Sequence, residues 1–202
     1  MQNYQQLQKE LGMKDALPVT VDWSAAADFL FLIKEYCLEN KPQVIVECSS
    51  GLTSITLARC CQINMSGQVY SLENGEEYAN QSRDNLKMFS LDPFATILHS
   101  PLDKVSIDES SYDWYKLTDL PDVKIDMLVI DGPPGFIQRH SRFPALPLLF
   151  DRLAEKSIVF LDDAARAEEK QLVSMWLDLY PEIEHEYVET ERGCSILMVN
   201  KN

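Results

Sequence analysis

The sequence lacks any long hydrophobic run. Its longest strongly apolar run covers residues 27–33, far short of the roughly 18 residues that a membrane-spanning helix needs. Residues 1–12 show no basic start followed by an apolar stretch, so we expect no signal peptide. With 202 residues, 46% hydrophobic and 25% charged, the composition is that of a globular protein and argues against general disorder. We expect a single domain, 1–202, of which 1–22 form an N-terminal extension.

Positive charge is scarce. The chain has 18 Lys and Arg against 32 Asp and Glu, and its formal net charge is −14. A chain this acidic repels a nucleic-acid backbone or an anionic membrane surface unless its basic residues gather on one face, and the sequence shows no such gathering. We therefore expect neither nucleic acid nor a membrane as a partner. A small molecule or a protein partner remains, and apolar strands near the C-terminus permit a homodimer.

No C-x-x-C pair occurs among the five cysteines, which stand at 37, 48, 60, 61 and 194, and the three histidines are scattered. A zinc site of the Cys/His kind is therefore not expected. An odd number of cysteines without a secretion signal indicates reduced thiols in a cytoplasmic protein.

Hydrophobic patterns alternate between helix and strand spacing along the chain. Short, almost wholly apolar strands between helices predict a Rossmann-like, doubly wound α/β fold, in which helices cover both faces of a mostly parallel sheet. The helical patterns cover 24–39, 52–62, 76–89, 144–154 and 165–180, and the strand patterns cover 44–48, 68–72, 95–99, 126–130 and 157–161.

Two further segments differ from this alternation. Strand patterns at 183–189 and 195–199 flank the turn residues 191–193, so we expect an antiparallel C-terminal hairpin that completes a seven-stranded sheet. Residues 103–121 are acidic and are interpreted as an irregular, long connection of the kind that is often functional or mobile. Its aromatic residues Tyr112, Trp114 and Tyr115 suit either a lid or substrate wall, or a small cluster packed under the loop.

In open α/β sheets ligands bind outside the carboxyl ends of the strands, where the strand order reverses. The first strand ends at Glu47 and leads into the small residues Ser49, Ser50 and Gly51, with Thr53 in the next helix. Such a loop lets backbone approach a ligand closely. Glu47 disfavours a pyrophosphate but suits a ligand with an ammonium group, and no G-x-G-x-x-G run is present. The alternative is a plain turn with a solvated Glu47.

The second strand ends at Glu73 and Asn74. A carboxylate in this position can accept both hydroxyls of a ribose, as the acid of dinucleotide-binding folds does, although it can also be one surface acid among many. Ser100 follows the third strand, where it suits either an adenine pocket or a simple turn.

Acidic side chains also follow the fourth and fifth strands. Asp131 opens the rigid turn Asp-Gly-Pro-Pro-Gly at 131–135, and Asp162 and Asp163 follow the fifth strand. Three carboxylates on adjacent strand ends can form an all-oxygen site for Mg²⁺. Alternatively, one Asp caps the next helix and the others pair with Arg139, Arg142 or Arg166.

Taken together, these residues resemble the class I S-adenosylmethionine-dependent methyltransferases, most closely the small O-methyltransferase-like branch with an Asp-Gly-Pro-Pro-Gly turn. The resemblance covers the chain from about Trp23 to the C-terminus. It rests on VIVECSSGLTS at 44–54, VYSLEN at 69–74, YDWY at 112–115, IDMLVIDGPPG at 125–135, RFPALPLL at 142–149 and IVFLDDAAR at 158–166.

The resemblance implies S-adenosylmethionine (SAM) as cofactor, with Glu47 near its methionine part and Glu73 on its ribose. The acids 131, 162 and 163 look similar to the metal site of catechol O-methyltransferase-like enzymes, so Mg²⁺ is a candidate cofactor. The first loop glycine of the family is Ser49 here, and a positive φ at a serine would cost about 1 kcal/mol or more. The expected cofactor contacts are Glu47, Ser49, Ser50, Gly51, Thr53, Glu73, Asn74, Ser100 and Asp131.

The function that follows is transfer of a methyl group to a small-molecule acceptor, with oxygen the preferred acceptor atom. Asp131 would act as the base or hold the metal. His140 is a second candidate base, or else a surface residue of the basic cluster 139–142. That cluster would attract an anionic substrate. Two alternatives remain: a non-catalytic binding protein on the same fold, and an NAD-dependent oxidoreductase.

Overall fold

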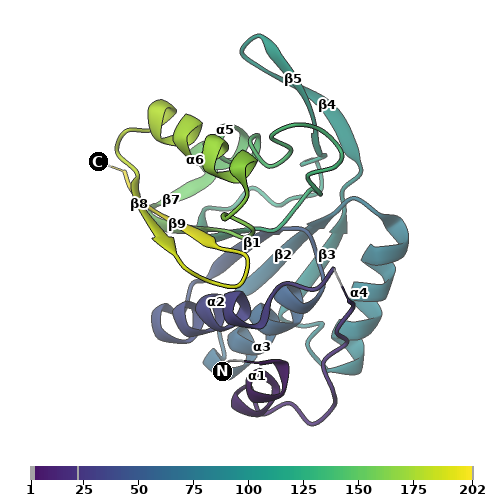
Figure 1. The fold of residues 1–202 in the computed structure, drawn as a ribbon. Coiled ribbons are helices and arrows are strands. Elements are labelled where there is room, and N and C mark those ends of the chain that lie inside the picture. The colour runs from purple at the N-terminus through teal and green to yellow at the C-terminus, as the bar shows by residue number, and fades with distance from the viewer. Residues whose placement is uncertain (1–2, 22, 202) are drawn as a thin grey trace.

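The computed structural model describes residues 3–21 and 23–201, and a seven-stranded sheet forms its centre (Figure 1). Across the sheet the strands follow the order β3 (Ala95–His99), β2 (Gln68–Glu73), β1 (Val44–Cys48), β6 (Ile125–Ile130), β7 (Leu153–Leu161), β9 (Cys194–Asn200) and β8 (Glu184–Val188). The first five are parallel, and β9 is antiparallel to both β7 and β8. The expected Rossmann-like sheet with its C-terminal hairpin is therefore confirmed.

Helices cover both faces of the sheet. On one face lie α1 (Tyr4–Glu10), α2 (Ala27–Asn40), α3 (Leu52–Asn64) and α4 (Glu76–Met88), and on the other lie α5 (Ala145–Leu149), the 3₁₀ turn η1 (Phe150–Arg152) and α6 (Ala167–Leu179) (Figure 1). Each face buries its own apolar cluster.

The strands contribute alternate residues to the two clusters. Ile45 and Met127 face the cluster under α2 and α3, while Val46 and Leu128 face the cluster under α5 and α6. Strand residues alternate between the faces of a sheet, so a strand buried on both sides is apolar at most of its positions. This explains why the strand patterns in the sequence are almost wholly apolar runs.

The expectation of an irregular segment at 103–121 is wrong. β4 (Leu102–Ile107) and β5 (Ser110–Tyr115) form a separate antiparallel hairpin, which projects from the body of the molecule (Figure 1). Asp108 makes its tight turn with a φ of 50°. The hairpin was missed because consecutive exposed polar residues, at 103–104 and 110–111, interrupt the alternation with a period of two.

The helix expected at 144–154 is shorter than predicted. α5 and η1 end at Arg152, and β7 begins at Leu153, where it pairs with Ile125. A register shift between Ile125 and Met127 accommodates the extra residues. The periodicity of apolar residues cannot separate a short helix from an adjoining strand, so the sequence placed this boundary too late.

The N-terminal segment packs against the body. Leu7, Leu11 and Leu17 belong to the cluster under α2 and α3, and the Tyr4 hydroxyl donates to the carbonyl oxygen of Ala25 at 2.9 Å. The five cysteines are buried free thiols. No helix in 3–21 or 23–201 is long and apolar enough to cross a membrane.

The hairpin is anchored by Trp114, a fully buried side chain that packs on Tyr115 at 5.1 Å between ring centroids. Trp114→Ala should lower the free energy of unfolding by about 3–5 kcal/mol, because the cavity cannot collapse completely. Trp23 is 62% exposed, so Trp23→Ala should cost about 1 kcal/mol or less. Urea unfolding of both variants checks this, and equal losses would contradict the anchoring role.

Candidate active site

The strand order reverses between β1 and β6, so a crevice is expected at the carboxyl ends of these two strands. Backbone hydrogen bonds continue past the strand ends and hold the candidate loops side by side. Ser49 N–H donates to Leu72 O at 2.9 Å, Asp131 N–H to Cys48 O at 3.1 Å and Asp162 N–H to Ile130 O at 3.0 Å. The structure thus brings together the loops that follow four neighbouring strands.

Glu47 is fully buried at the end of β1. Its carboxylate accepts hydrogen bonds from the hydroxyls of Thr53, Ser54 and Ser71, the last two at 2.7 Å. Burial raises its pKa to about 7, and the three hydroxyls offset part of that rise. The alternative of a solvated Glu47 is wrong, because this carboxylate holds the start of α3 against β1 and β2.

The loop between β1 and α3 has a backbone that favours glycine. Ser49 has a φ of 122° and Gly51 a φ of 133°. A Cβ added to Gly51 would meet no atom within 4 Å, so the space beside this backbone is open. Ser49 therefore has the positive φ that the sequence left open, at a cost of about 1 kcal/mol or more.

Glu73 lies at the end of β2 with only 7% of its surface exposed. Its Oε2 accepts from the Ser50 hydroxyl at 2.8 Å, and its Oε1 accepts from the Gly75 N–H at 2.9 Å. Asn74 is half-buried beside it. Ser100 N–H donates to the Glu73 carbonyl oxygen at 2.7 Å, so the expected ribose and adenine residues are adjacent.

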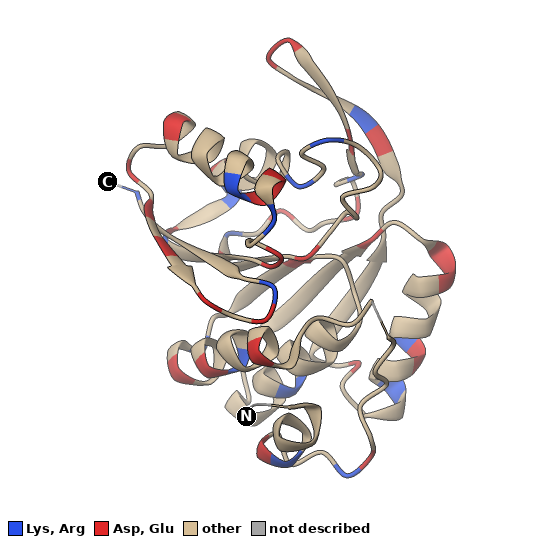
Figure 2. Cartoon of the chain, in the orientation of Figure 1, with Lys and Arg blue, Asp and Glu red and all other residues tan. Residues whose placement is uncertain are grey.

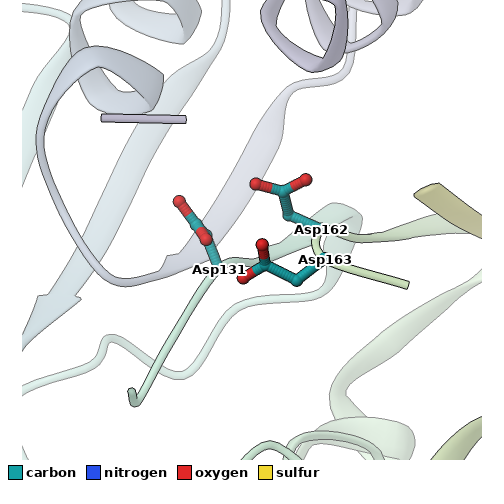
Figure 3. Close-up of side chains that lie close together, drawn as sticks. All are labelled: Asp131, Asp162 and Asp163. Atoms are coloured by element: carbon teal, nitrogen blue, oxygen red, sulfur yellow. The ribbon is translucent and has the colours of Figure 1, made fainter. Parts of the chain in front are cut away.

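Figure 3 shows the carboxylates of Asp131, Asp162 and Asp163 directed towards one another. One oxygen from each lies within 4.8 Å of the others. Both oxygens of Asp162 and the Oδ1 of Asp163 are buried without a hydrogen-bond partner in the described part of the chain. Burial is the main cause that raises the pKa of Asp131 to about 7 and that of Asp162 well above its usual range.

Arg142 is buried among these acids with 3% of its side chain exposed. It donates to the carbonyl oxygens of Asp162 at 2.9 Å and Asp131 at 2.8 Å, and to Oδ2 of Asp163 at 2.8 Å. Burial alone would lower its pKa, but the surrounding carboxylates raise it. Arg166 also reaches Asp163 Oδ2 at 2.9 Å. Among the arginines considered from the sequence, Arg142 and Arg166 thus pair with the acids.

The basic cluster 139–142 does not form one patch. Arg139 and the His140 ring both bond Gln171 on α6, at 3.2 and 3.0 Å, and His140 N–H donates to Glu168. Arg142 points instead into the acid cluster. The structure therefore does not bring His140 to Asp131, and its proposed role as a base stays a prediction.

Sequence reasoning missed Ser54 and Ser71, and it considered Tyr115 only as part of a lid, a substrate wall or a small cluster packed under the 103–121 segment. Ser71 lies opposite Glu47 in the β1–β2 register, and Ser54 lies in the first turn of α3. A Cβ on Gly132 would lie 2.4 Å from the Tyr115 hydroxyl, so this tyrosine packs beneath the Asp131 turn. The register of β1 on β2 was the signal for Ser71. The place of Tyr115 beneath the Asp131 turn was not predicted, because the hairpin was unrecognised.

Residues 46–164 match the family model described as a methyltransferase domain, which is more than half of the chain. The chain belongs to this methyltransferase family. No curated protein matches the sequence.

Solved structures of methyltransferases share the fold. An O-methyltransferase from Bacillus cereus in complex with S-adenosylhomocysteine (SAH) has 13% identity and a TM-score of 0.68, with 98% of this chain and 90% of that chain covered. The O-methyltransferase of tomaymycin synthesis from Streptomyces achromogenes, in complex with SAM, has 12% identity and a TM-score of 0.66, with 96% and 86% covered. A SAH-bound methyltransferase from Podospora anserina has 13% identity and a TM-score of 0.69, with 98% and 88% covered.

The buried Glu47 should make stability depend on pH. Between its ordinary pKa of 4.5 and about 7 the folded state holds a proton that the unfolded state has lost, so the free energy of unfolding falls as the pH rises through this window. The wild-type protein should therefore have a higher free energy of unfolding at about pH 5 than at about pH 8, and Glu47→Gln should reduce this difference by up to about 3 kcal/mol. Urea unfolding at both pH values measures it. The exposed control Glu35→Gln on α2 should keep the full difference, and an unchanged difference in Glu47→Gln would contradict the assignment.

Proposed function

We propose that the protein transfers a methyl group from SAM to a small-molecule acceptor, and that the acceptor atom is an oxygen. The observation that carries this proposal is the meeting of the 49–51 loop, Glu73 and Asp131 at one sheet edge, in a chain of the methyltransferase family. The SAM and SAH bound to similar folds support the choice of cofactor. The family match favours this reaction over an NAD-dependent oxidation.

The cofactor suits the open side of the β1–α3 loop. The space beside Gly51 is free, and the buried acids Glu47 and Glu73 lie at the ends of the neighbouring strands β1 and β2. Glu73 would accept from the ribose hydroxyls, with Ser50 already bonded to it at 2.8 Å. Glu47 would act indirectly on the cofactor, because the hydroxyl groups that bond its carboxylate keep the loop above it in place. The remaining contacts expected from Ser49, Thr53, Asn74 and Ser100 are part of the same proposal.

Bound SAM supplies an electrophilic methyl group on a sulfonium. The protein's own residues must hold the acceptor in line with it, exclude water and take the proton that the acceptor hydroxyl loses. Asp131 is suited to that proton, since a pKa of about 7 lets it be ionised in part at neutral pH and still bind the proton afterwards. Arg142 bonds its backbone oxygen at 2.8 Å and so fixes the residue.

A divalent cation fits the same acids. The unpartnered oxygens of Asp162 and Asp163 face Asp131, while Arg142 and Arg166 bond the other oxygen of Asp163. We propose that Asp131, Asp162 and Asp163 can hold Mg²⁺, whose preferred ligands are carboxylate oxygens. When bound there, it would lower the pKa of the acceptor hydroxyl.

The remaining proposals concern the acceptor, the location in the cell and the oligomeric state. A small-molecule acceptor is part of the same proposal, and the five free thiols support a cytoplasmic location. The homodimer stays a prediction. A protein that binds SAM without turnover is the alternative that the strained Ser49 keeps open.

Glu73→Ala should weaken SAM binding by about 1–3 kcal/mol, because the ribose hydroxyls and the Ser50 hydroxyl lose a buried acceptor. Isothermal titration calorimetry with SAM measures this. Glu77→Ala removes an equal charge from the exposed first turn of α4 and should bind as the wild type does. Equal affinity in Glu73→Ala would remove the ribose role from Glu73.

Asp131→Asn should reduce turnover by about 10²-fold or more, measured as SAH released with the hydroxyl acceptor that the wild type methylates best. If the acids hold Mg²⁺, chelation should abolish wild-type activity and added Mg²⁺ should restore it. If Asp131 acts alone, chelation should change nothing. A variant with normal turnover per folded molecule and a lower melting temperature would make the acid cluster purely structural.

A further inference from the structure

Arg192 lies in the turn between β8 and β9, which is fixed on the rim of the acid cluster. Its carbonyl oxygen accepts from Ala165 N–H at 2.9 Å, and the Gly193 carbonyl accepts from Ala164 N–H at 2.9 Å. Glu191 N–H donates to Asp28 Oδ2 at 2.6 Å. The turn is thus held between the residues that follow Asp163 and the first turn of α2.

Gly193 makes this position rigid. Its φ is 75°, and an added Cβ would lie 2.5 Å from both Ala165 N and the Tyr187 hydroxyl. The backbone of Arg192 therefore cannot move away without breaking the contact with the 164–165 loop. Figure 2 shows one basic position beside acidic ones at the end of this hairpin, close to the acidic strand ends at the centre of the molecule.

The guanidinium of Arg192 has no hydrogen-bond or ion-pair partner among residues 3–21 and 23–201, although the side chain is half-buried. The other arginines all have partners. They are Arg59 with Leu11 O, Arg83 with Ile97 O, Arg139 with Gln171, Arg142 with Asp163, Arg152 with Pro121 O, and Arg166 with Asp163. The N–H donors of the Arg192 guanidinium are therefore available to a ligand beside the loop that follows Asp163.

The positive charge of Arg192 acts on the acid cluster. The pKa of Asp131 is raised chiefly by burial, and Arg192 is one of the two arginines that oppose the rise. The burial of the Tyr4 hydroxyl raises its pKa too, and Arg192 is the strongest opposing charge. The charge of Arg192 thus acts both on Asp131 and on Tyr4, whose hydroxyl bonds the carbonyl oxygen of Ala25.

We propose that Arg192 binds the anionic oxygen group of a ligand in the crevice. A guanidinium presents parallel N–H donors that match a carboxylate or phosphate in bidentate fashion. The proposal rests on the proposed function and adds its anion-recognising residue, in place of the 139–142 cluster. Two sources share this chemistry: the carboxylate in the methionine part of the cofactor, and an anionic group on the acceptor.

Calorimetry on the full chain distinguishes the two sources. The first pair of ligands is SAH and 5′-methylthioadenosine, which lacks the amino-acid part. The second pair, added to SAH-loaded protein, is 3,4-dihydroxybenzoate and catechol, which differ by one carboxylate. Arg192→Gln is the test variant, and Lys170→Gln, which removes an exposed charge from α6, is the control.

If the cofactor is the source, Arg192→Gln should bind SAH at least 10-fold more weakly and 5′-methylthioadenosine equally well, and Arg192→Lys should recover part of the loss. If the acceptor is the source, SAH should bind normally and only 3,4-dihydroxybenzoate should lose at least 10-fold. Unchanged affinities for all four ligands, or equal losses for charged and uncharged members of a pair, would overturn the proposal. If the wild-type protein binds no SAH, the proposed function is overturned together with this proposal. If the wild type binds SAH and Arg192→Gln changes no affinity, only this proposal is overturned.

Discussion

The buried guanidinium of Arg142 ties together the strand ends on which the site is built. It bonds the backbone oxygens that follow β6 and β7, and it carries a positive charge into a group of three acids. Without it, the Asp163 carboxylate would keep only the half-exposed Arg166, and an unpaired buried charge costs about 3–5 kcal/mol when its partner is removed. The positions of Asp131, Asp162 and Asp163 therefore depend on a residue from the loop before α5.

Much of the fold could be predicted because burial on both faces leaves a strong signal. Short, almost wholly apolar runs such as 44–48 and 126–130 are typical of buried strands or short helices, and the turn residues around them select strands. The β4–β5 hairpin gave no such signal, because it stands on the body with one face solvated and is held by only a few side chains, above all Trp114. The early start of β7 depends on pairing with Ile125, which a local pattern cannot reveal.

The candidate site was predictable where it depends on topology and unpredictable where it depends on side-chain partners. Residues after parallel strands meet at one edge, so Glu47, Glu73 and Asp131 could be grouped from the sequence. Whether Glu47 faces solvent or three hydroxyls depends on the register of β1 on β2 and on the first turn of α3. Arg192 comes from the opposite end of the chain, and only the antiparallel return of β9 beside β7 places it there.

The burial of the cysteines has a consequence for chemical reactivity. A thiol must ionise before it reacts, and burial is among the causes that raise the pKa of Cys48 and Cys194 above the usual range. Cys37 on α2 and Cys61 on α3 are both fully buried, and the neighbouring Cys37 thiol together with burial raises the pKa of Cys61 above the usual range. Alkylating reagents should therefore reach these sulfurs only when the layers separate. The rate of thiol modification thus reports, helix by helix and strand by strand, how often each part of the core opens.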